Sequence, residues 1–164
     1  MTPASSDRRW LTLAIVGAAF FMTILDVAIV NVAIPSIQID LHINEQTVQW
    51  VITAYAITFG GFLLLGGRMA DLLGRKRIFL VGLTLFTIAS LVCGFANSSS
   101  VLISARAVQG LGAAIISPAA LSLLTTTFAE GAERNKALGI WGAIAGMGGA
   151  VGVLLSGILV DSVS

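Results

Sequence analysis

The sequence alternates between long apolar runs and short polar stretches. Five of the runs are long enough to cross a bilayer, which needs about 20 mostly apolar residues. These predicted membrane-spanning helices cover approximately residues 10–33, 48–67, 78–96, 101–128 and 137–160. We expect Pro35 to end the first helix, because proline lacks the amide hydrogen that a helix interior needs. The pattern therefore predicts an all-α membrane protein with five transmembrane helices.

Basic residues fall on one side of this layout. Eight of the nine lysines and arginines lie before the first helix or in the links after the second and fourth helices: Arg8, Arg9, Arg68, Arg75, Lys76, Arg77, Arg134 and Lys136. The opposite loops, 36–47 and 97–100, contain none. Because cationic loops stay on the cytoplasmic side, we expect a cytoplasmic N-terminus and residues 161–164 outside. Four or six spans would scatter these charges over both faces.

Composition supports the membrane class and excludes several others. Hydrophobic residues make up 57% of the chain, charged residues 10%, and the mean hydropathy is +0.98, so a soluble protein of this size would lack a polar surface. The net charge of +1 does not suggest a nucleic-acid partner. With one histidine, His42, and one cysteine, Cys93, neither a metal cluster nor a nucleophile–base pair can be assembled, so we expect neither an enzyme nor a cofactor. Cys93 is interpreted as a small core residue and His42 as an incidental surface residue.

Two ionisable residues lie inside predicted spans, Asp26 in the first and Arg106 in the fourth. A charge at such depth costs several kcal/mol unless it is paired or hydrated. The helical rise places Asp26 about 24 Å and Arg106 about 21 Å above the cytoplasmic boundary. We therefore expect the two to face one polar cavity and to interact, directly or through water. Low dielectric favours a neutral aspartate, so protonation would release the arginine, although a purely structural ion pair remains the alternative.

Three stretches resemble motifs of the major facilitator superfamily. The link after the second helix reads Gly67-x-x-x-Asp71-x-x-Gly74-Arg75, with Arg75 as the local partner of Asp71. The fourth helix carries Arg106 followed by Gln109-Gly110-x-Gly112. The first helix carries Leu25-Asp26 and then Ile29-Val30-Asn31-Val32-Ala33-x-Pro35, which is similar to the fourteen-helix drug:proton antiporter branch. The resemblance implies that Gly67, Asp71, Gly74 and Arg75 form a conformational gate loop.

The same resemblance assigns further roles. It implies a substrate path along Asn31, Trp50, Tyr55 and Gln109, although Trp50 also fits an anchor at the membrane interface. The fifth helix is rich in glycines, and small residues four apart let helices pack closely. The expected helix-packing glycines are Gly110, Gly112, Gly142, Gly146, Gly152 and Gly157. The fifth helix departs from the antiporter motif at Val153, where the family has proline, and at Ser156, where it has glycine, which puts the kink in doubt.

The resemblance implies a proton-coupled multidrug efflux antiporter of the plasma membrane that works by alternating access. Its partners would be protons, a hydrophobic small molecule and the lipid bilayer. Five helices make an incomplete N-terminal half, so we expect an N-terminal fragment that does not transport alone. Two alternatives stay open: a truncated membrane protein that acts as an interaction partner, or a transporter of another substrate such as a siderophore or a lipid.

Overall fold

The computed structural model describes the backbone of residues 3–163 and the side chains of residues 7–155 and Ile158. Within these residues the chain forms five α-helices and no strand: α1 (Pro3–Asp40), α2 (Glu45–Leu73), α3 (Arg75–Gly94), α4 (Ser99–Thr127) and α5 (Ala132–Val163). All five are long and apolar enough to cross a membrane. The predicted all-α fold with five spans is confirmed.

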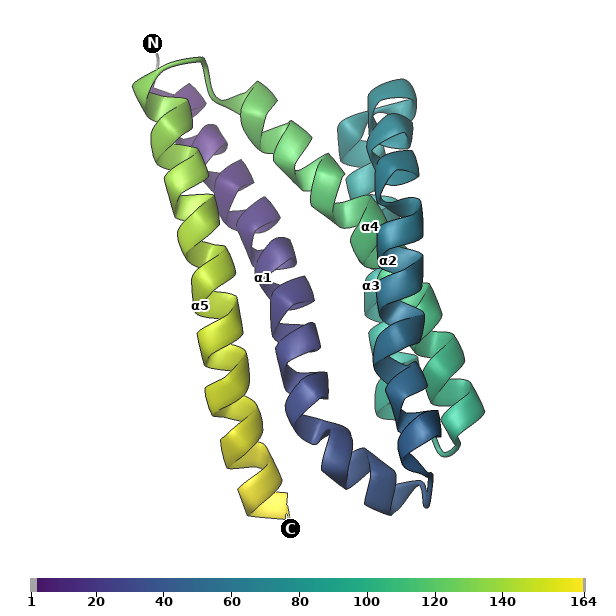
Figure 1. Ribbon diagram of the computed structural model, residues 1–164. Coiled ribbons are helices and arrows are strands. Elements are labelled where there is room, and N and C mark those ends of the chain that lie inside the picture. The colour runs from purple at the N-terminus through teal and green to yellow at the C-terminus, as the bar shows by residue number, and fades with distance from the viewer. Residues whose placement is uncertain (1–2, 164) are drawn as a thin grey trace.

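The helices run up and down, so the basic segments meet at one end of the molecule. The N-terminus, the link between α2 and α3 and the link between α4 and α5 lie at the top of Figure 1. The links that lack basic residues, and the C-terminal end of α5, lie at the bottom. This arrangement fits the charge sorting that assigns the top to the cytoplasm.

The predicted end of the first helix at Pro35 is wrong, because α1 continues through this proline to Asp40. Proline is tolerated inside membrane helices, where neighbouring groups satisfy the carbonyl that it leaves free. The last helical residue is Asp40, and the chain turns at His42, whose φ of 50° is left-handed. The amide of Ile43 donates to the Gln38 carbonyl and that of His42 to Ile39, which is the hydrogen-bond pattern of a Schellman cap.

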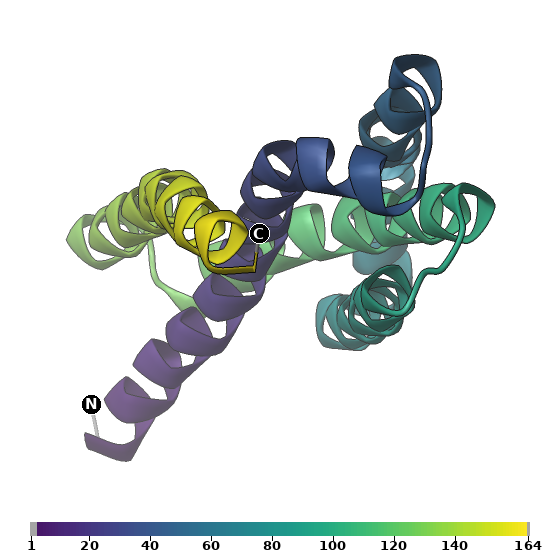
Figure 2. The ribbon, with the colours of Figure 1, turned by 90° about the horizontal axis from the view of Figure 1, so that it is seen from below.

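Helix α4 forms the centre of the bundle and packs chiefly against α2 and α3, whereas α1 packs chiefly against α5. Seen from below, α4 passes between α2 and α3 and extends toward α1 and α5 (Figure 2). Its middle carries small side chains with no exposed surface, including Ala113, Ala114 and Ala119. Because these side chains are small, neighbouring backbones come close to α4, which favours tight packing in lipid.

Local sequence signals account for the short links. Asn44 caps α2, since its Oδ1 accepts from the Thr47 amide at 2.8 Å. Gly74 alone separates α2 from α3 and has φ +99°, a conformation that side chains with a Cβ rarely adopt.

Aromatic and charged contacts join α1 to the α4–α5 region at the cytoplasmic end. Arg9 Nη1 lies 2.8 Å from Glu133 Oε2, and the Trp10 ring meets Phe128 edge-on at 5.3 Å. Further along, the rings of Phe20 and Trp141 stack with centroids 4.2 Å apart. These contacts hold α1 and α5 side by side.

Candidate functional site

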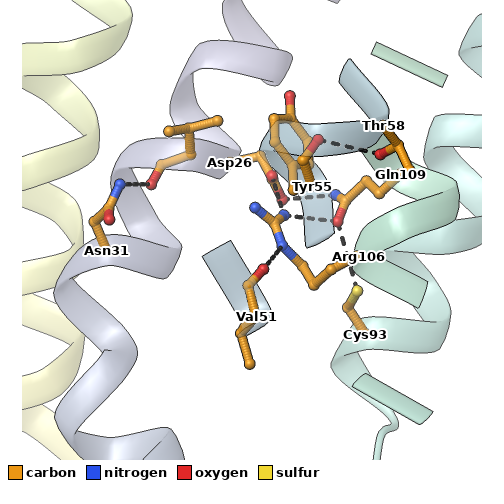
Figure 3. A network of polar contacts seen from close by, with 9 residues as sticks. Asp26, Asn31, Val51, Tyr55, Thr58, Cys93, Arg106 and Gln109 are labelled. Carbon is orange, nitrogen blue, oxygen red and sulfur yellow. Dashed lines mark hydrogen bonds and ion pairs between the residues drawn. The ribbon is translucent and has the colours of Figure 1, made fainter. Parts of the chain in front are cut away.

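A buried ion pair links α1 to α4 near the middle of the bundle. Arg106 Nη1 donates to Asp26 Oδ2 at 2.5 Å, as Figure 3 shows. The Arg106 side chain is 2% exposed and that of Asp26 is 16% exposed. The structure thus brings together the two residues that the helical rise placed at one level. Their predicted role in proton coupling stays a prediction.

Gln109 lies one turn after Arg106 and completes a closed triangle of hydrogen bonds. Its Nε2 donates to Asp26 Oδ1 at 2.7 Å, and its Oε1 accepts from Arg106 Nη1 at 2.8 Å. The amide therefore touches both charged partners. Gln109 has no exposed surface, so it acts within the ion-pair network, and its expected place on a substrate path stays a prediction.

Two groups of this network were not recognised from the sequence. The thiol of Cys93 on α3 donates to Gln109 Oε1 at 3.5 Å, and the Val51 carbonyl on α2 accepts from Arg106 Nε at 3.2 Å. The sequence context of Cys93 predicts a plain core residue, because nothing in it points to a partner. A backbone carbonyl carries no side-chain signal at all. Four helices, α1 to α4, therefore contribute to the site.

The ring of Tyr55 covers the guanidinium. Arg106 Cζ lies 4.3 Å from the centroid of this ring, a cation–π contact, and Tyr55 stacks on Phe59 at 6.0 Å. The predicted substrate-path residue Tyr55 thus contacts the predicted coupling residue directly. Gly110 allows Tyr55 to come this close to Arg106, because a Cβ at Gly110 would overlap the Tyr55 carbonyl and the Thr58 hydroxyl.

A cavity of about 570 Å³ opens beside the network between α1, α2, α4 and α5. This volume suits a small molecule, since ligand pockets commonly span roughly 300–1,000 Å³. Arg106, Tyr55 and Asn31 line it, so two of the four predicted substrate-path residues border one cavity. Trp50 does not line this cavity and is 53% exposed, which fits its alternative reading as an interface anchor.

The predicted gate loop lies at the cytoplasmic end, far along α2 from the network. Asp71 and Arg75 pair across the Gly74 link at 3.9 Å, with side chains 56% and 41% exposed. A Cβ at Gly67 would make an ordinary contact with Pro118 of α4 at 3.5 Å. The expected local pairing of Asp71 with Arg75 is present, and the gating role stays a prediction.

The glycines of α5 divide into two groups. A Cβ at Gly152 would overlap the Ala28 methyl, and one at Gly148 would lie 3.0 Å from Ile24, so both allow α1 to approach closely. A Cβ at Gly142 or Gly146 would meet nothing within 4 Å among the described residues. Gly157 and Ser156 lie outside the described side chains. Helix α5 continues unbroken past Val153, in keeping with the absence of the family's proline.

Comparison with known proteins agrees with these features. The sequence model of the Major Facilitator Superfamily matches residues 16–164. The puromycin resistance protein pur8 of Streptomyces alboniger is 51% identical over 94% of this chain and 31% of its own length. The cephamycin export protein CmcT of Amycolatopsis lactamdurans is 45% identical over 99% of this chain and 34% of its own. The multidrug resistance protein Stp of Mycobacterium tuberculosis is 45% identical over 92% of this chain and 28% of its own length. The chain therefore spans about a third of the length of these relatives.

Proposed function

Because the chain belongs to the major facilitator superfamily, we propose that it forms the first part of a proton-coupled drug exporter, with Asp26 as the proton carrier. Relatives named for puromycin resistance and cephamycin export support drug export as the activity. The chain is a multi-pass membrane protein, and the plasma membrane is where such an exporter would act. We also propose that the substrate site is completed by the part of the relatives' sequences that this chain does not span.

The observation that carries the proposal is the Asp26–Arg106 ion pair at the edge of a cavity. A carboxylate within a membrane protein is a functional group by default, because its burial is costly. Asp26 keeps 16% of its side-chain surface, so a proton can reach it, whereas Arg106 is almost fully buried. The carboxylate is therefore the member of the pair suited to exchange protons.

Protonation would change the network in a defined way. An ionised Asp26 accepts from Arg106 and Gln109 at once and so ties α1 to α4. A protonated Asp26 carries no charge and loses most of its attraction to the guanidinium. The link between α1 and α4 would then weaken, which couples proton uptake to movement of these helices. Antiport follows if the substrate is held in the paired state and released from the protonated one.

The test is export in a full-length transporter that carries this sequence as its first part, reconstituted in vesicles with an imposed pH gradient. We expect Asp26→Asn to abolish gradient-driven export, because asparagine has no titratable proton. Asp26→Glu should retain part of it. The matched control is Asp40→Asn, the same change at the exposed end of α1, which should leave export unaltered. Full gradient-driven export by Asp26→Asn would refute Asp26 as the carrier.

A further inference from the structure

One nitrogen of the Arg106 guanidinium has no hydrogen-bond partner among the described residues. Nε donates to Val51, and Nη1 donates to Asp26 and Gln109. Figure 3 shows the remaining nitrogen, Nη2, without a dashed line and directed toward the helix that carries Asn31. Every fully buried side-chain nitrogen or oxygen in the described part of the chain has a partner. Nη2 is therefore open to the cavity that Arg106 lines.

The rest of the cavity wall is mainly apolar and aromatic. Phe20, Tyr55 and Phe59 contribute rings. The hydroxyls of Thr23 and Ser117 donate to carbonyls of their own helices, at 2.7 and 2.9 Å. Among the described residues that line this cavity, Arg106 is thus the charged donor that still has a free position.

The side-chain amide of Asn31 provides a second, weaker hydrogen-bonding group on the wall formed by α1. Its Nδ2 donates to the Val27 carbonyl at 2.8 Å, which leaves its own oxygen as an acceptor facing solvent or a ligand. A ligand donor can be received there, and a ligand acceptor can be received at Arg106 Nη2, the charged donor of this cavity. The two points set the polarity of a molecule that fills the cavity.

We propose that this cavity binds uncharged aromatic molecules through an acceptor of the carbonyl type, which accepts a hydrogen bond from Arg106 Nη2. This inference rests on the proposed export function and specifies its substrate class. The Asp26 carboxylate is already paired with Arg106, so the network offers a permanent cation no free carboxylate. A carboxylate would compete with Asp26 for the same guanidinium. An uncharged acceptor avoids both conflicts.

The site is preorganised by the contacts that hold Arg106. The Val51 carbonyl, the Gln109 amide, the Asp26 carboxylate and the Tyr55 ring fix the guanidinium from four directions. Nη2 therefore keeps its direction without a ligand, and binding does not have to immobilise it. Preorganised donors raise affinity because the ordering cost is already met by the fold.

The test compares two probes that differ in one group. Benzophenone has two rings joined by a carbonyl, and diphenylmethane has the same rings joined by a methylene. The unmodified chain is placed in nanodiscs, and equilibrium binding is measured after subtraction of partition into empty nanodiscs. We expect benzophenone to bind saturably and at least about tenfold more tightly than diphenylmethane, as a hydrogen bond to a charged donor predicts. Equal affinities, or tetraphenylphosphonium binding as tightly as benzophenone, would overturn the inference.

Two variants locate the binding. Arg106→Lys removes Nη2 and should reduce the preference for benzophenone to less than about threefold. Because this buried change can also disturb folding, Ala56→Phe is the second variant, since Ala56 lines the cavity without touching the network. It should abolish saturable binding of benzophenone. Its control is Ile57→Phe, the neighbouring residue, which is 60% exposed and does not line this cavity. Unchanged binding in Ala56→Phe would place the probe elsewhere and refute the proposal.

The outcomes separate this inference from the proposed function. Equal binding of the two aromatic probes refutes the substrate class and leaves the Asp26→Asn transport result unaffected, because that experiment uses neither probe. Full gradient-driven export by Asp26→Asn together with a clear benzophenone preference refutes proton carriage and leaves the binding site in place.

Discussion

Helices α2 and α4 approach each other through two glycines on opposite partners. A Cβ at Gly110 of α4 would overlap the Tyr55 carbonyl and the Thr58 hydroxyl of α2, and one at Gly66 of α2 would overlap the Ala114 carbonyl of α4. Backbone atoms cannot rotate away as a side chain can. Gly110→Ala therefore forces the two helices apart next to the ion pair.

The cost of this variant can be worked out against a matched change. Overpacking of this kind destabilises a fold by about 1–3 kcal/mol. Alanine also favours a helix over glycine by about 0.5–1 kcal/mol. Gly60→Ala on α2 raises helix propensity by the same amount, but its Cβ would meet nothing within 4 Å among the described residues. The difference in unfolding free energy between the two variants therefore isolates the overlap, at about 1–3 kcal/mol.

Reversible unfolding of the chain in mixed detergent and SDS micelles measures this difference. We expect Gly110→Ala to unfold at a lower SDS fraction than the unmodified chain, and Gly60→Ala at the same fraction or a higher one. Because Tyr55 moves with α2, Gly110→Ala should also weaken benzophenone binding. Equal stability of the two alanine variants would refute the close approach of α2 and α4 at this level.

Three further variants test other contacts, each by the same unfolding measurement. Gln109→Leu removes one partner from Asp26 and one from Arg106 and should cost about 1–3 kcal/mol, so a neutral result would contradict the closed triangle. Cys93→Ala removes only a weak thiol donor and should cost less than about 1 kcal/mol, whereas a larger loss would show that the thiol matters more than its geometry indicates. Glu133→Gln breaks a partly exposed ion pair and should cost at most about 1 kcal/mol, an effect that 1 M salt should erase if the contact is electrostatic.

The sequence allowed the fold and the centre of the site to be predicted because both depend on strong, local signals. Charge sorting fixes the number of spans, since each basic loop must lie on one side of the bilayer. The rise per residue is constant in a helix, so two buried charges can be compared in depth before any packing is known. This comparison of depth predicts that Asp26 and Arg106 interact, and the structure pairs them.

The features that could not be predicted depend on packing between helices. Proline is unfavourable inside an isolated helix, which predicts a helix end at Pro35, but the hydrogen bonds around His42 decide where α1 stops. The thiol of Cys93 reaches Gln109 only because α3 lies beside α4. Periodicity alone also does not distinguish Gly152, which touches α1, from Gly146, which touches no neighbour among the described residues.

The extension of α1 past Pro35 carries Ile37 into an aliphatic cluster beside the network. This aliphatic plug, a cluster at the outer ends of α1 and α2, consists of Ile34, Ile37, Leu41, Val48 and Val51. Val51 is also the residue whose carbonyl holds Arg106, so the plug lies directly against the guanidinium. The turn that α1 adds past Pro35 thus places an aliphatic side chain, Ile37, at the outer end of the network.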